Sequence, residues 1–254
     1  MRFTVIIPAR FASTRLPGKP LLDIGGKPMI QRVYEQACSS EASEVVIATD
    51  DSRIREACEQ FSAKVIMTRG DHASGTDRLQ EAASILTLAD DALVVNVQGD
   101  EPLMPAELIN QVAGNLHSRS QIEVATLCEP LDSLDDFQNP NIVKVVSDSD
   151  GSALYFSRAP IPWPRDAFIN APGQWPEAHI AQRHLGIYAY RVALLNRFVA
   201  WPQSRLERAE CLEQLRVLEN GAGIHVDTAC TTLPAGIDTE EDLQRVRDQF
   251  APAS

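Results

Sequence analysis

The sequence lacks the features that would assign it at once to a membrane, secreted or common nucleotide-binding class. No apolar run has the length of a transmembrane segment. The residues after Arg2 are β-branched and do not resemble the core of a signal peptide. A Walker A loop and a G-x-G-x-x-G fingerprint are both missing. We therefore expect a cytoplasmic protein without membrane insertion, and any nucleotide site must use another kind of loop.

Basic residues are scarce. The chain has 23 Lys and Arg against 35 Asp and Glu, which gives a net charge of -12 and a pI near 4.8. This balance argues against a protein that coats nucleic acid or lies on an anionic membrane. An anionic small ligand therefore needs a local basic site.

Cysteine is also sparse, and no C-x-x-C pair is present. An odd number of widely spaced cysteines indicates reduced thiols in a cytoplasm, not a disulfide framework or a zinc site. The five are Cys38, Cys58, Cys128, Cys211 and Cys230.

The composition is that of an ordinary soluble globular protein. The chain has 254 residues, of which 44% are hydrophobic and 23% charged. This length suffices for one large or two small domains with a substantial core. We find no internal repeat, low-complexity tract or flexible linker.

The first twenty residues hold the positive charge that the rest of the chain lacks. The run 3–8 is apolar and predicts a buried strand. Arg10, Arg15 and Lys19 follow among small residues, and no acid occurs before Asp23. Such a loop at the carboxyl end of a strand brings backbone N–H groups and cations to phosphate oxygens. We interpret it as a triphosphate cradle; an ordinary loop with solvated cations is the alternative.

Strands and helices alternate through the first half of the chain, which predicts a parallel sheet with helices on both faces. Ligands bind such sheets beyond the carboxyl ends of the strands. The cradle, the polar loop 69–78 and the segment 98–101 all fall at such ends. The expected strands are 3–8, 44–48, 64–67 and 92–97, and the expected helices are 28–39, 52–61, 77–88 and 105–117.

The pattern changes from residue 123. A turn-rich segment and a proline-rich excursion interrupt short strands, and 184–190 alternates like a half-exposed strand. The expected strands are 124–128, 143–147, 154–157, 184–190 and 224–228. The expected helices are 192–200, 207–219 and a last one that Thr239 caps and that ends near 250.

Eight segments in order along the chain resemble the 3-deoxy-manno-octulosonate (Kdo) cytidylyltransferases. The segment around the cradle is shared with many sugar nucleotidyltransferases, whereas those around residues 98–102, 158 and 184 are more specific to Kdo activation. The stretch 166–178 matches less well, so we assign no function to it. The matching segments are IPARFASTRLPGKPL (7–21), ATDD (48–51), SGTDR (74–78), NVQGDEP (96–102), SRAPIPW (157–163), HLGIY (184–188), LEQLR (212–216) and GIDTEEDL (236–243).

The resemblance implies a reaction between CTP and Kdo. The anomeric hydroxyl of Kdo attacks the α-phosphate of CTP, which gives CMP-Kdo for lipopolysaccharide assembly and releases pyrophosphate. Such a transfer needs positioning and charge neutralisation. The implied catalytic residues are Arg10, Arg15, Lys19 and Asp100. The implied nucleotide-binding residues are Ala9, Arg10, Ser13, Lys19, Ser74 and Gly75.

The expected cofactor is Mg²⁺, held by Asp100 and Asp238 together with phosphate oxygens and water. The alternatives are that Asp100 is a turn residue and that Asp238 caps a helix. The implied sugar pocket consists of Arg78, Gln98, Arg158, His184, Tyr188, Glu213 and Gln214.

Structural roles remain open for three residues of that pocket. Arg78 could pair with acids on its own helix, His184 could be a hydrogen-bonded strand residue, and Glu213 could lie on a solvated helix face.

The fold implied is a three-layer α/β/α Rossmann-like nucleotide-diphospho-sugar transferase (GT-A-like) fold with a smaller β-rich lobe. Within one nucleotidyltransferase domain, residues 1–135 and 236–254 are expected to bind the nucleotide, and 136–235 to bind the sugar and form a homodimer. The strand at 184–190 and the Pro-Trp-Pro segment at 162–164 are the candidate dimer surface.

Three other functions remain as alternatives. A cytidylyltransferase for sialic acid or an amino-substituted Kdo would use the same cradle. A GT-A-type glycosyltransferase would need a D-x-D motif, which residues 100–102 do not supply. A non-catalytic nucleotide sensor would not need the metal-binding acids.

Overall fold

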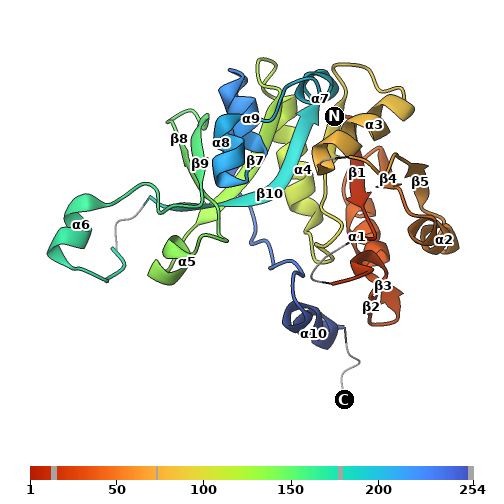
Figure 1. Cartoon of the computed structure of the whole chain (residues 1–254), viewed down its shortest axis with the longest axis horizontal. Helices are drawn as coiled ribbons and strands as arrows, with labels where there is room; N and C mark the ends of the chain where they lie inside the picture. Colours follow the sequence, from red (N-terminus) through yellow and green to blue (C-terminus); the bar gives the residue numbers. More distant parts are fainter. Residues whose placement is uncertain (13–15, 73, 177–179, 251–254) are drawn as a thin grey trace.

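The computed structural model describes residues 1–12, 16–72, 74–176 and 180–250 of the chain. Seven strands form the main path of one mixed sheet. Their order is β11 (Ile224–Thr228), β7 (Val124–Pro130), β10 (Gln182–Arg191), β6 (Leu93–Asn96), β1 (Phe3–Ala9), β4 (Glu44–Thr49) and β5 (Lys64–Met67). Two further strands, β8 (Lys144–Ser147) and β9 (Ala153–Ser157), continue the sheet at one side. Helices cover both faces of this sheet (Figure 1). The expected three-layer α/β/α fold is therefore confirmed.

The first half of the chain forms the parallel part of the sheet. The strands are β1 (Phe3–Ala9), β4 (Glu44–Thr49), β5 (Lys64–Met67) and β6 (Leu93–Asn96). β1 pairs in parallel with both β4 and β6, and β4 pairs with β5. Their carboxyl ends consequently lie along one edge, as the sequence predicted.

The second half completes the sheet with β7 (Val124–Pro130), β10 (Gln182–Arg191) and β11 (Ile224–Thr228). β10 lies antiparallel between β6 and β7. Leu185 and Ile187 pack on one face and Tyr188 and Tyr190 on the other, and all four are buried. The prediction of a half-exposed strand was therefore wrong, and its buried residues are not accessible to a partner, which leaves the segment 162–164 as the predicted dimer surface.

Two apolar clusters separate the layers. Phe3, Val5 and Ile7 of β1 face one cluster, and Ile6 faces the other. The helices on the first face are α1 (Met29–Cys38), α2 (Ser52–Gln60) and α4 (Ala106–His117). Those on the second face are α3 (Gly75–Ile85), α7 (Val192–Phe198) and α9 (Gln214–Glu219), with α8 (Arg205–Glu210) packed on α9. Among the described residues, no helix is long and apolar enough to cross a bilayer.

The predicted helix 207–219 is two short helices, α8 and α9. The chain breaks between them because Cys211 adopts the left-handed conformation, with φ 53° and ψ 49°. Ser204 caps α8 through a reciprocal pair of hydrogen bonds with Glu207. The break redirects Glu213 and Gln214, so the positions of their side chains do not follow from one continuous helix.

The remaining elements lie at the margins of the sheet. β2 (Asp23–Ile24) and β3 (Lys27–Pro28) form a small hairpin, and a 3₁₀ turn, η1 (Lys19–Leu21), precedes it. Thr239 caps α10 (Glu240–Gln249), as predicted. The short helices α5 (Leu134–Gln138) and α6 (Arg165–Asn170) were not predicted, because each lies within a turn-rich or proline-rich stretch.

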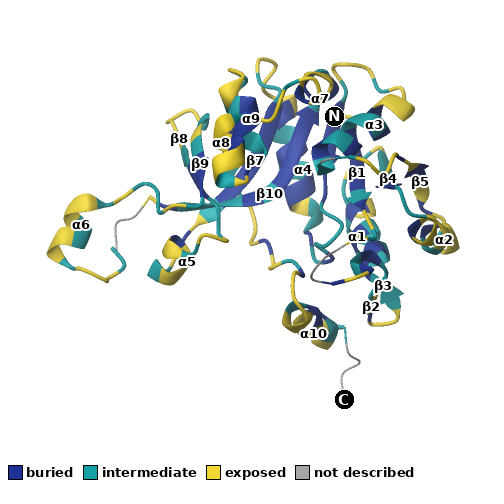
Figure 2. Ribbon diagram, in the orientation of Figure 1, coloured by how far each residue is buried: buried dark blue, intermediate teal, exposed yellow. Residues whose placement is uncertain are grey.

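An arm extends from the sheet beyond the start of β10. It contains α5, α6 and the segment 158–176, beside the hairpin of β8 (Lys144–Ser147) and β9 (Ala153–Ser157) (Figure 1). Its outer surface is largely exposed (Figure 2). The lobe expected at 136–235 is smaller than predicted as a structural unit, because β10 and β11 belong to the main sheet. A role of this segment in sugar binding and dimerisation stays a prediction.

Candidate active site

The site begins where β1 ends, at the carboxyl edge of the parallel strands. Ala9 is buried, and the exposed Arg10 follows it. Gly99, in the loop after β6, lies against β1 so closely that a Cβ there would be 2.9 Å from the Pro8 carbonyl oxygen. This approach brings Gln98 and Asp100 beside Arg10, and all three line one cavity of about 430 Å³.

Lys19 joins the two acids that were predicted to hold a cation. Its Nζ lies 2.7 Å from an Asp100 carboxylate oxygen and 3.4 Å from one of Asp238. The lysine side chain is only 12% exposed, whereas the carboxylates are 40% and 57% exposed and face the cavity. Asp100 and Asp238, which lie 81 and 219 positions after Lys19 in the sequence, thus meet at one positive charge.

The backbone fixes Asp238 at this place. The N–H of Ile237 donates to the carbonyl oxygen of Asp100, at 3.1 Å. Thr239, not Asp238, is the N-cap of α10, and the N–H of Asp238 donates to the Asp242 carboxylate. The carboxylate of Asp238 is therefore not used as the cap, which leaves it directed to Lys19.

Glu101 adds a buried carboxyl beside this pair. Burial, followed by the neighbouring Asp100 charge, raises the pKa of Glu101 to about 8. Its Oε2 is buried and makes no hydrogen bond within the described residues. It lies beneath Gly236, where a Cβ would be 3.5 Å from the Glu101 Cγ. The side chain thus packs under the turn that leads to Asp238.

The first turn of α3 forms the opposite wall. Ser74 caps the helix, since its hydroxyl accepts from the Asp77 N–H while the Asp77 carboxylate accepts from the Ser74 N–H. Ser74 and Gly75 line a cavity of about 340 Å³ with Ala9 and Arg10. A helix N-terminus beside a guanidinium group suits a negatively charged or hydrogen-bond-accepting ligand.

Arg78 lies deeper on the same helix and is 4% exposed. Its guanidinium pairs with Asp50, at 3.1 Å, and donates to the Thr68 hydroxyl, at 2.6 Å. The expected alternative partners on its own helix are therefore not the ones it uses. Arg78 lines the cavity of Arg10 and Ser74, so it ties the ends of β4 and β5 to that wall.

Four predicted sugar residues meet around a narrow inner cavity of about 60 Å³. The four are Gln98, Tyr188, Glu213 and Gln214. The hydroxyl of Tyr188 and the Oδ1 of Asn96, which also line this cavity, are buried without a hydrogen-bond partner among the described residues. Buried polar atoms without partners are costly in a folded protein, so these two atoms are available to a ligand.

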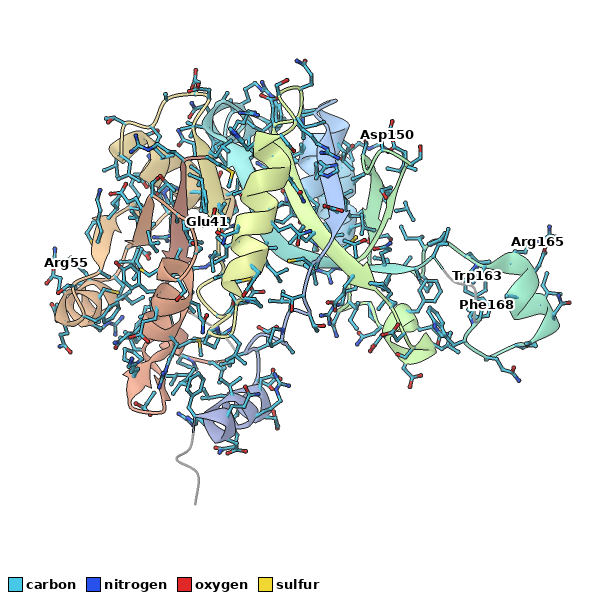
Figure 3. All side chains as sticks on the ribbon, turned by 180° about the vertical axis from the view of Figure 1, so that it is seen from behind. Glu41, Arg55, Asp150, Trp163, Arg165 and Phe168 are labelled. Carbon is cyan, nitrogen blue, oxygen red and sulfur yellow. The ribbon has the colours of Figure 1, made fainter. Side chains whose placement is uncertain are left out.

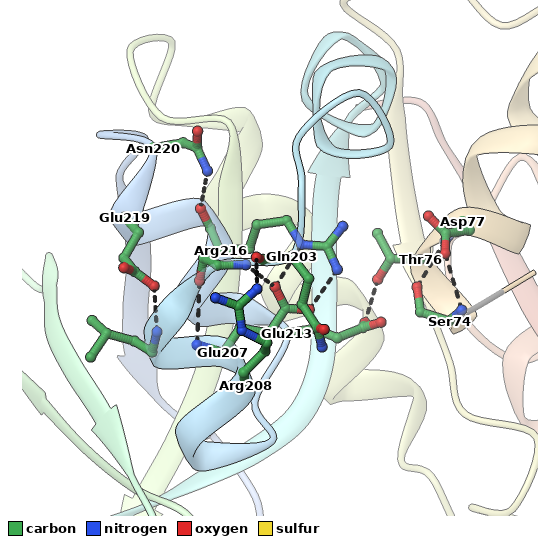
Figure 4. Close-up of polar contacts among 12 residues, drawn as sticks. Ser74, Thr76, Asp77, Gln203, Glu207, Arg208, Glu213, Arg216, Glu219 and Asn220 are labelled. Carbon is green, nitrogen blue, oxygen red and sulfur yellow. Dashed lines mark hydrogen bonds and ion pairs between the residues drawn. The ribbon is translucent and has the colours of Figure 1, made fainter.

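Glu213 connects the inner cavity to the wall formed by α3. Its carboxylate accepts a hydrogen bond of 2.8 Å from the Thr76 hydroxyl, as Figure 4 shows. The sequence did not single out Thr76 or Asn96, although both lie within the matching segments 74–78 and 96–102. Neither residue is ionisable, so neither drew attention as a candidate.

His184 lies on β10 next to Tyr188, with ring centroids 5.3 Å apart. Its Nε2 is 3.0 Å from the Thr126 hydroxyl, and its ring packs edge-on against Phe156. Burial lowers the pKa of His184 to about 3. The imidazole is therefore neutral at physiological pH and bonded inside the fold, which is the structural alternative for this residue. It also borders a fourth cavity, of about 600 Å³, which Asp100 and Asp238 line as well.

Arg158 is bound to the backbone around the junction of α8 and α9. Its guanidinium donates to the carbonyl oxygens of Glu210, at 2.7 Å, Pro140, at 2.9 Å, and Cys211, at 3.4 Å. It does not line the cavities of Arg10, Lys19 or Glu213. The structure therefore brings together all the described candidates except Arg158, since His184 contacts Tyr188 and shares a cavity with Asp100 and Asp238. Ser13 and Arg15 lie outside the described residues.

The donor set at Asp100 and Asp238 fits a hard divalent cation. Two carboxylates facing one ammonium group form a place where positive charge is stabilised, and Mg²⁺ takes one or two carboxylates with phosphate oxygens and water. No group of three or more His, Cys, Asp or Glu within the described ranges is arranged as a complete metal site. A phosphate ligand would thus have to supply further oxygens.

Comparison with known proteins gives consistent results for sequence and structure. Residues 4–226 match the cytidylyltransferase family model. The chain is 62% identical to a 3-deoxy-manno-octulosonate cytidylyltransferase of Cellvibrio japonicus, with 97% of each chain covered. It is 58% identical to the protein of that name from Hahella chejuensis, with 99% of each covered.

Solved structures agree with these relatives. A CMP:2-keto-3-deoxy-manno-octonic acid synthetase complexed with CTP superposes with a TM-score of 0.89 at 43% identity, and 98% of each chain is covered. A cytidylyltransferase from Leptospira borgpetersenii has a TM-score of 0.63 at 17% identity, with 99% of this chain and 88% of that one covered, and it shares the fold alone.

Proposed function

The chain belongs to the cytidylyltransferase family, and from this premise we propose that it couples CTP to Kdo, giving CMP-Kdo and pyrophosphate. It is a nucleotidyltransferase, and its relatives match it over nearly the whole length. The product would enter lipopolysaccharide assembly in the cytoplasm.

One observation carries the assignment of the site. Lys19 is held between Asp100 and Asp238 in a cavity that Arg10 also lines. In a chain of net charge -12, this is a place where a triphosphate finds cations together with two carboxylates. Arg10 neutralises phosphate charge by bidentate contact, and Lys19, with three donors, binds a phosphate oxygen while it keeps a carboxylate partner.

The reaction is a displacement at the α-phosphorus. The anomeric hydroxyl of the sugar releases its proton to solvent, and its oxygen forms a bond to this atom. The bond to the oxygen that bridges the α- and β-phosphates breaks, and pyrophosphate leaves with that oxygen. Arg10 and Lys19 stabilise the negative charge that accumulates on the departing group. The loop 98–100 and the turn at Asp238 orient the phosphates for in-line attack.

We propose Mg²⁺ as the cofactor, with Asp100 and Asp238 as its protein ligands. When bound, it supplies charge stabilisation at the α-phosphate and lowers the pKa of a coordinated hydroxyl. The two carboxylates are 40% and 57% exposed, so a hydrated cation can reach them from the cavity while Lys19 keeps one carboxylate contact.

The inner cavity is proposed to receive the sugar acid beside the nucleotide. Gln98 lines this cavity and both of the cavities assigned to the nucleotide, so it lies between the two substrates. Tyr188, Glu213 and Gln214 offer hydrogen-bonding groups to the sugar hydroxyls. Ser74 and Gly75 are proposed to line the pocket of the base, where backbone groups can read the edge of cytosine.

The decisive experiment measures pyrophosphate release from defined substrates. We expect release only when CTP and Kdo are both present, with little from ATP or GTP. Sialic acid and 8-amino-Kdo are tested as competing sugars; preference for either would overturn the choice of Kdo. Release dependent on both substrates excludes a nucleotide sensor, and absence of glycosyl transfer from CMP-Kdo excludes a GT-A-type glycosyltransferase.

We also propose that the protein is a homodimer that pairs through the arm. Trp163 is 57% exposed, Ile169 63% and Ile180 77%. Trp163 packs on Phe168 at the end of the arm, with ring centroids 4.6 Å apart (Figure 3). Such an apolar group is costly in water unless another surface covers it.

Sedimentation of the wild type and of Trp163→Ser/Ile180→Ser tests this pairing. We expect a dimer and a monomer, respectively, and a wild-type monomer at micromolar concentration would reject the dimer.

A further inference from the structure

Thr76 occupies a place in the site that the proposed function leaves unexplained. It lies in the first turn of α3, directly after Ser74 and Gly75, and is only 4% exposed. Its hydroxyl donates to Glu213 across 137 residues of sequence. A buried hydroxyl that bonds a carboxylate makes one of the stronger neutral-to-charged hydrogen bonds.

The bond forms the partition between two cavities. Thr76 and Glu213 both line the cavity of Ser74, Gly75 and Arg10, and both line the narrow cavity of Tyr188 and Gln214. A change at Thr76 or at Glu213 therefore alters the walls of both cavities. The inner cavity, at about 60 Å³, is too small for an eight-carbon sugar acid, so this partition must adjust when the sugar enters.

A buried ion pair holds the helix that follows Glu213. Arg216 donates to both carboxylate oxygens of Glu207, at 2.8 and 2.5 Å, and both side chains are almost fully buried. This pair holds α9 against α8 across the break at Cys211 (Figure 4). Arg216 also packs over the Phe198 ring. The base of Glu213 is therefore fixed, and the Thr76 hydroxyl orients its carboxylate.

Thr76 is equally fixed on its own side. The reciprocal bonds between Ser74 and Asp77 hold the first turn of α3 (Figure 4). Ser74 and Gly75 line the cavity proposed for the nucleotide, and Thr76 is the next residue along the chain. The hydrogen bond from Thr76 to Glu213 then links this turn to the cavity proposed for the sugar.

We propose that Thr76 is a positioning residue that orients Glu213 and thereby couples the nucleotide wall to the sugar wall. This inference rests on the proposed function, since it assigns the two cavities to CTP and to the sugar acid. It predicts that each substrate raises the affinity of the other through this bond, as linkage requires.

Two substitutions separate the hydroxyl from the shape of the side chain. Thr76→Val keeps the volume and removes the donor, whereas Thr76→Ser keeps the donor and removes the methyl group. We expect Thr76→Val to raise the KM for Kdo about tenfold, which is the scale of one hydrogen bond to a charged group. Thr76→Ser should stay within about twofold of the wild type. By linkage, the KM for CTP at saturating Kdo should also rise in Thr76→Val, whereas the affinity for CTP alone should change little in both variants.

Calorimetry of CTP binding with and without Kdo provides the second measurement. Binding is measured in EDTA, which removes the proposed Mg²⁺ and thereby is expected to prevent turnover. The wild type should bind CTP more tightly when Kdo is present, Thr76→Ser should keep this gain, and Thr76→Val should lose it. Thermal unfolding checks that each variant folds; if the valine variant does not, Thr76→Ala carries the same comparison with a smaller side chain.

The outcomes separate this inference from the proposed function. If the wild type releases no pyrophosphate from CTP and Kdo, the proposed function is wrong. If the wild type is active and Thr76→Val keeps its KM for Kdo and its gain in CTP affinity, the role of Thr76 is overturned. Equal losses in the valine and serine variants would also overturn it, because shape would then matter and not the hydroxyl.

Discussion

Gly99 lies against Pro8 with no room for a side chain, since a Cβ at residue 99 would be 2.9 Å from the Pro8 carbonyl oxygen. The obstacle is backbone, which cannot rotate away as a flexible side chain would. Gly99→Ala should therefore push the loop 98–100 from β1 and displace Gln98 and Asp100. We expect a loss of about 1–3 kcal/mol in the free energy of unfolding and a larger loss of turnover.

Gly114→Ala is the matched control for this substitution, because Gly114 lies in α4 outside the cavities of the site and a Cβ there would meet no atom within 4 Å. Chemical denaturation and pyrophosphate release measure the two effects. Wild-type turnover in Gly99→Ala would show that the close approach to Pro8 does not position Asp100.

The pair Asp100 and Asp238 predicts how the protein responds to metal. In the wild type, Mg²⁺ added with CTP should raise the melting temperature, because a ligand that binds only the folded state stabilises it. Asp100→Asn should fold but lose most of this rise, and its turnover should drop about 100-fold or more.

Asp150→Asn, in the exposed loop between β8 and β9, is the control and should behave like the wild type. Normal turnover of Asp100→Asn at saturating Mg²⁺ would reject the assigned role of Asp100.

The buried imidazole of His184 predicts a specific sensitivity to acid. Burial holds its pKa at about 3, against 6.5 in the unfolded chain. Between these values the unfolded chain binds the additional proton, so stability falls as the pH drops through this window. At pH 5 the cost is about 2 kcal/mol relative to pH 7.

His184→Gln removes the titrating group and should abolish this part of the loss. Its neighbours Thr126, Phe156 and Tyr188 are uncharged, so the comparison concerns the imidazole alone. Urea denaturation at pH 7 and pH 5 measures the difference, with His117→Gln at the exposed end of α4 as control. Equal pH dependence in wild type and His184→Gln would mean that the imidazole is protonated inside the fold.

The sequence was informative wherever one physical rule acts within a short window. The strands at Lys64–Met67 and Ile224–Thr228 were predicted with their observed bounds, because β-branched runs between turn residues have few alternatives. The Thr239 cap followed from its carboxylate-rich first turn. The prediction of one helix over 207–219 was wrong because the apolar spacing continues across Cys211. The left-handed conformation of this residue could not be predicted, since cysteine does not favour it.

The residues of the site show the same difference between features that depend on a short segment and features that depend on the fold. Lys19, Asp100 and Asp238 were identified because each belongs to a segment of charged or turn residues that resembles a known family. The bond between Thr76 and Glu213 could not be predicted, since it depends on where α3 and α9 meet over 137 residues of sequence. Arg158 was predicted to bind the sugar because of its segment, whereas its three carbonyl partners become visible only in the folded chain.

Arg158 therefore has a test that distinguishes direct from indirect action. Arg158→Ala leaves the carbonyls of Glu210, Cys211 and Pro140 without a donor, so we expect a loss of about 1–3 kcal/mol in stability. If Arg158 also serves the sugar, the KM for Kdo should rise much more than the KM for CTP. Equal changes in the two KM values would count against a sugar contact and leave the structural role alone.

Cys211 has a left-handed backbone conformation, which is strained for a residue with a Cβ. Glycine adopts this conformation without that cost, although it adds freedom to the unfolded chain. Cys211→Gly should therefore stabilise the protein by about 0.5–1 kcal/mol. Ala209→Gly, two residues earlier on the exposed face of α8, should instead destabilise it by about 1 kcal/mol.

Urea denaturation of the two glycine variants measures these opposite signs. Because α8 and α9 keep their geometry in Cys211→Gly, we expect its KM for Kdo to equal that of the wild type. A destabilised Cys211→Gly would show that the break between α8 and α9 is not strained, and that the left-handed residue costs the fold nothing at the junction that presents Glu213.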